Sequence, residues 1–237
     1  MMQLTIDKVS LGYNGHVIVN DISFKVNQGD YLCIIGENGA GKTTLLKSIL
    51  NLQGVCAGSI TLGEGFKRSD LGYLPQHRDV QKDFPASVHE IVASGNLNKC
   101  GLRPFFNKKE KEKIKENMQK VGIENLAKRC YRELSGGQQQ RVLPARALVA
   151  SSKMILLDEP VAGLDPDATK DMYELIAKLN KEDGITVIMI SHDITSALKN
   201  CTHVLKLEKN GTWEFVRHKA PESKIQGKSQ AKGGNQK

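Results

Sequence analysis

The stretch "GENGAGKTT", residues 36–44, stands between two segments with different hydrophobic patterns. Residues 29–36, "GDYLCIIG", form a short apolar run that ends in glycine, which is typical of a buried strand. Residues 42–52, "KTTLLKSILNL", carry apolar side chains at helical spacing. Because a strand leads into the glycines and a helix leads out of them, the stretch is predicted to be a phosphate-binding loop.

The loop follows the pattern G-x-x-x-x-G-K-[ST] through Gly36, Gly41, Lys42 and Thr43. Glycines let successive backbone N–H groups point inward as an anion nest, and the following helix presents its positive end to the phosphates. Lys42 is expected to supply a point charge for the β- and γ-phosphates, and the Thr43 hydroxyl is expected to reach Mg²⁺. The residues expected to bind nucleotide here are Gly36, Asn38, Gly39, Ala40, Gly41, Lys42, Thr43 and Thr44.

Two further apolar runs end in ionisable residues. The run "MILLDEP" (154–160) brings Asp158 and Glu159 to a strand terminus, where adjacent carboxylates are costly unless they meet cations or water. We expect Asp158 on the Mg²⁺ side and Glu159 facing the attacking water. The run "ITVIMIS" (185–191) leads into His192, at the edge where open α/β sheets bind ligands, so His192 is expected to reach a γ-phosphate.

A second helix start that suits an anion lies in "RELSGGQQQR" (132–141). Ser135 and Gln138 have the spacing of a capping box, which predicts that a helix begins there. Gly136 and Gly137 leave the N–H groups of the first turn open to a phosphate. Since the chain already has one phosphate loop, the pattern raises the question of which phosphate this turn contacts.

The motifs "LSGGQ", "LLDEP", "GLDP" and "SHD", in this order after the phosphate loop, resemble the ATP-binding subunits of ABC transporters over residues 2–210. The resemblance implies an α/β fold with a P-loop NTPase core, an N-terminal antiparallel β subdomain and a helical signature subdomain inserted at about residues 77–150. It also implies that two copies pair head to tail, so that the signature turn of one chain closes on the ATP of the other.

The resemblance assigns roles to single residues. Tyr13 is expected to stack on adenine, Gln76 of "LGYLPQ" to link Mg²⁺ to the membrane partner, and Asp165 of "AGLD" to act in the D-loop. Glu159 is expected to be the catalytic base and His192 the switch histidine. The residues expected to serve the opposite site are Ser135, Gly136, Gly137 and Gln138. The expected Mg²⁺ ligands are Thr43, Gln76 and Asp158.

The implied activity is Mg²⁺-dependent ATP hydrolysis that powers a separate polytopic permease at the cytoplasmic face of the membrane. The segment "FPASVHEIVASG" (84–95) resembles importers of divalent metals such as zinc and manganese, and of iron chelates. An extracytoplasmic binding protein is the expected indirect partner. An iron-chelate importer ATPase, a soluble ABC ATPase, a small-molecule kinase and an exporter remain alternatives, and co-purification with a membrane protein discriminates among the classes.

The net charge of +8 on 237 residues is uneven, because residues 206–237 carry eight Lys and Arg against three Glu. We therefore expect no nucleic-acid partner. Residues 211–237 are expected to be a basic mobile tail, since they offer few apolar side chains to bury. The apolar runs are shorter than the roughly 20 residues of a membrane-spanning helix.

Pro144 departs from the family pattern, which has an aliphatic residue at this place. If a helix begins after Ser135, the proline lies inside it, removes the N–H that bonds to the Gln140 carbonyl and crowds that carbonyl. We expect a kinked helix, or alternatively one that ends before Leu143. We also expect Pro144→Leu to raise the melting temperature.

Overall fold

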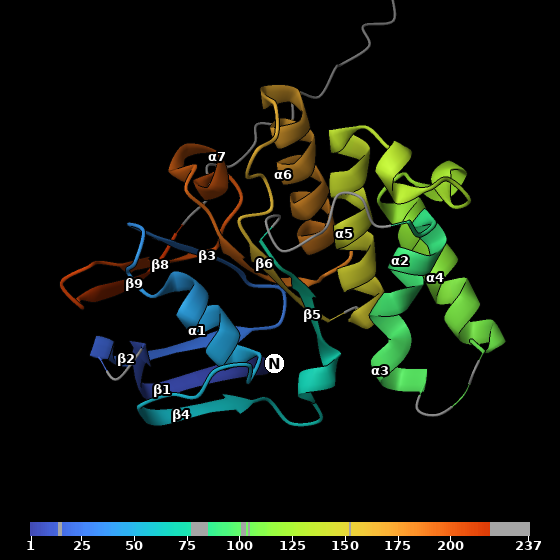
Figure 1. Ribbon diagram of the computed structural model, residues 1–237. Coiled ribbons are helices and arrows are strands. Elements are labelled where there is room, and N and C mark those ends of the chain that lie inside the picture. Colours follow the sequence, from blue (N-terminus) through green and yellow to red (C-terminus); the bar gives the residue numbers. More distant parts are fainter. Residues whose placement is uncertain (14–15, 77–84, 101–102, 104, 152, 219–237) are drawn as a thin grey trace, which may run out of the picture.

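The computed structural model describes residues 1–13, 16–76, 85–100, 103, 105–151 and 153–218. Two sheets lie beside one another, and a group of helices packs against the far edge of the larger sheet (Figure 1). The predicted combination of an α/β core, an N-terminal antiparallel β subdomain and a helical subdomain is confirmed.

The N-terminal sheet has three antiparallel strands in the order β2-β1-β4. They are β1 (Met2–Tyr13), β2 (His16–Asn27) and β4 (Ala57–Leu62). Side chains in β2 alternate between buried and exposed positions, as a strand with one face on a core requires. In the register between β1 and β2, Leu4 stands opposite Val26 and Ile6 opposite Phe24. The buried face packs against α1 (Lys42–Ile49).

The larger sheet has six strands in the order β5-β6-β7-β3-β8-β9. Its strands are β3 (Tyr31–Gly36), β5 (Leu71–Leu74), β6 (Met154–Asp158), β7 (Thr186–Ile190), β8 (His203–Leu207) and β9 (Trp213–Arg217). All pairs except β8–β9 are parallel. Every residue of β6 and β7 is buried, because helices or the second sheet cover both faces. The carboxyl ends of β3, β6 and β7 therefore meet at one edge.

The sheet continues past residue 210, where the sequence prediction ended the domain. Strand β9 pairs antiparallel with β8, so residues 213–217 belong to the sheet and not to a tail. The ring of Phe215 stacks on Phe24 of the N-terminal sheet with 5.1 Å between centroids, and Trp213 Nε1 donates to the carbonyl of Asn20. These contacts supply the apolar burial that the composition of the segment did not suggest. The rest of the predicted tail, residues 219–237, lies outside the described residues.

The other helices flank the larger sheet or form the helical subdomain. Beside the sheet lie α6 (Pro166–Lys181) and α7 (Ile194–Leu198). The helical subdomain contains α2 (Val88–Ala93), α3 (Leu97–Cys100), α4 (Lys108–Lys120) and α5 (Gly136–Ala150). Short 3₁₀ turns occupy Arg68–Asp70, Ser94–Asn96, Glu124–Leu126 and Tyr131–Glu133. Among the described residues, no helix has the length and apolar character needed to cross a membrane.

Helix α5 ties the helical subdomain to the sheet. A Cβ added at Gly72 of β5 would lie 2.4 Å from the carbonyl oxygen of Ala147, so strand and helix are in backbone contact. Helix α4 packs against α5. Its side chains Ile114 and Met118, together with Val121 just after the helix, form a buried stripe. The first residues of the predicted insert, 77–84, lie outside the part that the structure describes.

Helix α5 runs without interruption through Pro144. The alternative in which a helix ends before Leu143 is therefore wrong. The proline side chain is buried, and so are its neighbours in sequence, Val142 and Leu143 before it and Ala145 after it. Packing of these side chains offsets the local cost of the missing backbone hydrogen bond, which explains why the helix persists.

Candidate nucleotide-binding and hydrolysis site

The phosphate loop connects the carboxyl end of β3 to the first turn of α1. Gly39 has φ of 86° and Gly41 has φ of 92°, a left-handed conformation that other residues adopt only with strain. Gly41 is the N-cap residue of α1, and no side chain caps that helix among the described residues. The loop therefore presents the positive end of an eight-residue helix to whatever lies above it.

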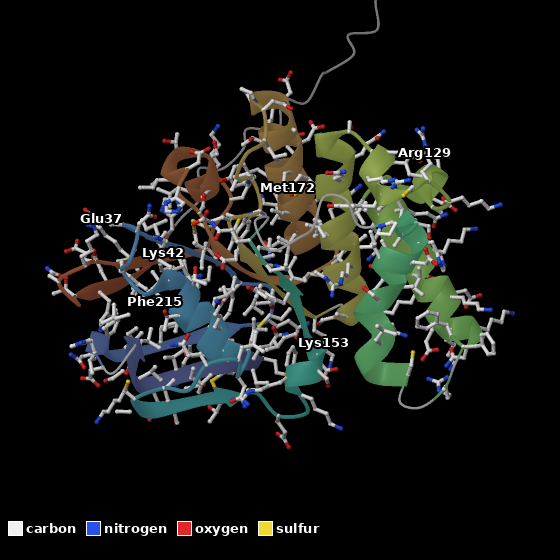
Figure 2. All side chains as sticks on the ribbon, viewed as in Figure 1. Glu37, Lys42, Arg129, Lys153, Met172 and Phe215 are labelled. Carbon is white, nitrogen blue, oxygen red and sulfur yellow. The ribbon has the colours of Figure 1, made fainter. Side chains whose placement is uncertain are left out.

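Lys42 is the buried cation of the loop. Its Nζ donates to the carbonyl oxygens of Gly36 and Glu37, each at 2.8 Å. Burial lowers the pKa of the Lys42 ammonium, while the carboxylates of Glu159 and Asp158 act in the opposite direction. Figure 2 shows Glu37 and Lys42 together beside α1, on the opposite side of the molecule from Arg129 of the helical subdomain. A polyphosphate would stabilise this cation, because its negative charge offsets the hydration that the ammonium group loses on burial.

Asp158, the last residue of β6, faces the start of α1. The Thr43 hydroxyl Oγ1 donates to Asp158 Oδ1 over 3.5 Å. Burial raises the pKa of the Asp158 carboxyl, and the neighbouring Glu159 charge raises it further. The hydroxyl of Thr43 and the buried carboxylate of Asp158 form a donor set that fits Mg²⁺, which takes few protein ligands and completes its shell with phosphate and water. No cluster of three or more His, Cys, Asp or Glu residues suited to a metal occurs in the described ranges.

Glu159 is held from two sides by residues that the sequence assigned to the same reaction. Gln76 Nε2 donates to Glu159 Oε2 at 2.7 Å, and His192 Nε2 lies 2.6 Å from Glu159 Oε1. The Glu159 side chain is only 16% exposed, and its backbone has a positive φ of 52°. The Glu159 carboxylate is thus fixed at the end of β6 between the amide of Gln76 and the imidazole of His192.

Behind His192 lies a buried contact that sequence reasoning missed. The hydroxyl of Tyr173, on α6, is 2.8 Å from the hydroxyl of Ser191. Ser191 Oγ also accepts the backbone N–H of Asp193. The two hydroxyls fix the turn that carries His192. No spacing rule links a tyrosine inside a helix to a strand end eighteen residues later, so the sequence offered no signal for this pair.

The phosphate loop, Gln76, Glu159 and His192 open onto one cavity of about 670 Å³. It is lined by Ile18, Asn38, Gly39, Gly41, Lys42, Thr43, Thr44, Gln76, Glu159 and His192. Ile18, on β2, was not anticipated, and it places an apolar side chain of the N-terminal sheet at the cavity. The predicted adenine partner Tyr13 ends β1, but its side chain lies outside the described part of the structure.

The signature turn and the D-loop residue do not line this cavity. Ser135 caps α5, since its hydroxyl accepts the N–H of Gln138 and the Gln138 side chain accepts the N–H of Ser135. The predicted capping box is confirmed. Asp165 Oδ1 caps α6 by accepting the N–H of Ala168 at 2.8 Å. Gly136 and Gly137 occupy the first turn of α5.

Comparisons with known proteins identify the family. A family model described as "ABC transporter" matches residues 19–162. The chain is 40% identical over 200 residues to the manganese transport system ATP-binding protein MntB of Bacillus subtilis (strain 168), covering 83% of this chain and 80% of that protein. It is 36% identical over 222 residues to the zinc uptake system ATP-binding protein ZurA of Listeria monocytogenes, covering 91% and 86%.

A solved structure agrees with these relatives. The inward-facing conformation of a putative metal-chelate type ABC transporter superposes with a TM-score of 0.82 and 27% identity, covering 92% of this chain and 84% of that one. The chain belongs to the ABC transporter family, whose ATP-binding subunits hydrolyse ATP to drive transport.

Proposed function

We propose that this chain energises the import of a divalent metal ion, zinc or manganese, through a separate permease. The observation that carries the proposal is the cavity at which the phosphate loop, Glu159 and His192 converge. Asp158 adjoins it through its hydrogen bond with Thr43. The metal comes from the relatives, since a manganese and a zinc transport protein both match most of the chain.

In the proposed reaction, Thr43, Asp158 and Gln76 would hold Mg²⁺, which when bound would neutralise phosphate charge. The N–H groups at the start of α1 and the Lys42 ammonium bind the phosphates and orient them for in-line attack. Glu159 accepts the proton of the attacking water. His192 keeps the Glu159 carboxylate in place and donates to the γ-phosphate.

Two copies of the chain are proposed to pair head to tail, so that each completes the ATP site of the other. Gly136 and Gly137 stand in the first turn of α5 and do not line their own chain's cavity, so a partner's ATP is the phosphate that their N–H groups suit. In this arrangement Ser135 and Gln138 complete the partner's site, and Asp165 lies at the contact between the copies. Tyr13 is proposed to stack on the adenine.

The location proposed for the chain is the cytoplasmic face of the cell membrane, where the permease holds it. An extracytoplasmic binding protein is proposed to deliver the ion to the permease. Two relatives, named as the ATP-binding proteins of a transport system and of an uptake system, support this position.

The proposal is tested by deleting the gene and measuring uptake of ⁶⁵Zn, ⁵⁴Mn and chelated ⁵⁵Fe in the same cells. We expect loss of zinc or manganese uptake, restoration by the wild-type gene and no restoration by the Glu159→Gln variant. Loss of iron-chelate uptake alone would assign the chain to the metal-chelate class that the solved relative represents. Unchanged uptake of all three would overturn the metal assignment.

A further inference from the structure

Two apolar side chains are exposed at one end of the helical subdomain, Leu97 at the start of α3 and Phe105 just before α4. Phe105 is 80% exposed and Leu97 is 60% exposed, whereas the adjacent Phe106 packs against the helical core. Monomeric proteins bear scattered exposed apolar residues without consequence. An exposed aromatic gains significance when its surroundings carry a consistent charge.

The charge around these side chains is strongly positive. Residues 85–150 contain thirteen Lys and Arg against six Glu, a net charge of +7. Residues 1–84 and 151–205 together contain thirteen Lys and Arg against seventeen Asp and Glu, a net charge of −4. The helical subdomain is thus a basic lobe on a chain that is otherwise acidic up to residue 205.

Three lysines at the start of α4 contribute charge that no local carboxylate neutralises. Lys108, Lys109 and Lys111 are exposed, and none has a carboxylate oxygen within 4.0 Å among the described residues. Glu110, which lies among them, already accepts the guanidinium of Arg103 at 2.7 Å and the backbone N–H that closes the helix cap. The lysine ammonium groups are therefore free to meet an external anion.

This surface lies away from the nucleotide site. A Cβ at Gly95, just before α3, would lie 2.2 Å from the carbonyl oxygen of Arg146, so α3 adjoins the carboxyl end of α5. The signature turn begins the same fifteen-residue helix, about 20 Å away. Figure 1 shows α3 and the beginning of α4 at the far end of the helical subdomain from that turn. Neither the phosphate loop nor the proposed contact between copies covers it.

We propose that the α3–α4 surface, Leu97, Phe105, Lys108, Lys109 and Lys111, binds the anionic headgroups of the membrane. Phe105 enters the headgroup region, where amphipathic and aromatic side chains gather, and the lysines lie against lipid phosphates. A lipid surface suits this patch better than a protein. Separate ammonium groups on flexible stems match a diffuse layer of negative charge and do not form the fixed, paired contacts of a protein interface. The inference does not depend on which ion is transported.

The test measures co-sedimentation of the full chain with vesicles of 3:1 phosphatidylcholine and phosphatidylglycerol, and with vesicles of phosphatidylcholine alone. The triple variant Lys108→Gln, Lys109→Gln, Lys111→Gln should lose about fivefold in binding per lysine, or about a hundredfold in all, on the anionic vesicles. The control variant Lys170→Gln, Lys178→Gln, Lys181→Gln removes the same charge from α6 and should change binding by less than about threefold. Salt should weaken the wild-type binding.

Insertion of the aromatic is tested separately. Trp213 is the only tryptophan of the chain, so Phe105→Trp in a Trp213→Phe background gives a single reporter. We expect lipids brominated near the headgroup to quench its fluorescence, and not to quench Trp213 in the wild-type chain. ATPase activity without lipid should be unchanged in every variant.

Three results would overturn the proposal. Equal loss in the α6 control would show that net charge alone drives binding, and retained binding in both variants would assign it to another part of the chain. Capture of a purified permease that is lost in Phe105→Ser, with vesicle binding intact, would assign the surface to the permease instead. Failure of the vesicle test leaves the ATPase and uptake results untouched, so it is distinguishable from failure of the proposed function.

Discussion

Replacing Pro144 by alanine is predicted to stabilise the chain, because the proline stands inside a continuous helix. A proline in a helix interior costs about 3 kcal/mol relative to alanine, through the missing N–H and the crowded carbonyl of Gln140. The ring is buried, so its removal forfeits about 1.6 kcal/mol of apolar burial from two methylene groups, and somewhat more if a cavity remains. The net gain is about 1 kcal/mol, which for a chain of this size raises the melting temperature by about 3 °C.

The assay is thermal unfolding without ligand, followed by circular dichroism. Pro144→Leu is the informative comparison, because the family pattern has an aliphatic residue at this place whereas the buried position has little room for a larger side chain. Pro144→Leu recovers the N–H but adds bulk to a packed position, and overpacking of about 1–3 kcal/mol cancels the gain. The sequence expectation of a higher melting temperature in that variant is thereby revised. A melting temperature of Pro144→Ala below that of the wild type would refute the reasoning.

Three further predictions concern the site. Burial raises the pKa of the Asp158 carboxyl, so its negative charge opposes folding above that pKa. Without Mg²⁺ and nucleotide, Asp158→Asn should therefore melt at a higher temperature than the wild type at pH 7. This difference should vanish as the pH falls to about 4, where the wild-type carboxyl is protonated in both the folded and the unfolded chain. Tyr173→Phe should cost about 1 kcal/mol in denaturant unfolding, because Ser191 keeps the N–H of Asp193 as a partner, and should lower kcat more than it changes KM. Mg-ATP should convert Glu159→Gln from monomer to dimer in light scattering, and a persistent monomer would contradict the head-to-tail arrangement.

Local patterns predicted most of the fold and the cavity. The phosphate loop, the carboxylates that end β6 and the capping box of Ser135 and Gln138 each depend on residues close together in sequence, where spacing and backbone chemistry decide the structure. The turn at Asn210 and Gly211, a dipeptide typical of hairpins, was the available signal for β9.

Contacts between distant segments could not be predicted in the same way. The hydrogen bond from Gln76 to Glu159 spans 83 positions, and the Tyr173 pair joins a helix to a strand end. Their distances follow from how the sheet and helices pack, which no periodicity encodes. Strand β9 was missed for a related reason, since its burial depends on Phe24 of the other sheet.

The central claim is that Glu159 accepts the proton of the attacking water in a cavity that binds ATP, and steady-state ATPase activity of Glu159→Gln tests it most directly. The amide has nearly the shape of the carboxylate and retains an oxygen for Gln76 Nε2, but it cannot accept a proton. We predict turnover lower by about 10²–10⁴-fold, with ATP affinity within threefold of the wild type. Turnover near the wild-type rate, with the same affinity, would contradict the account.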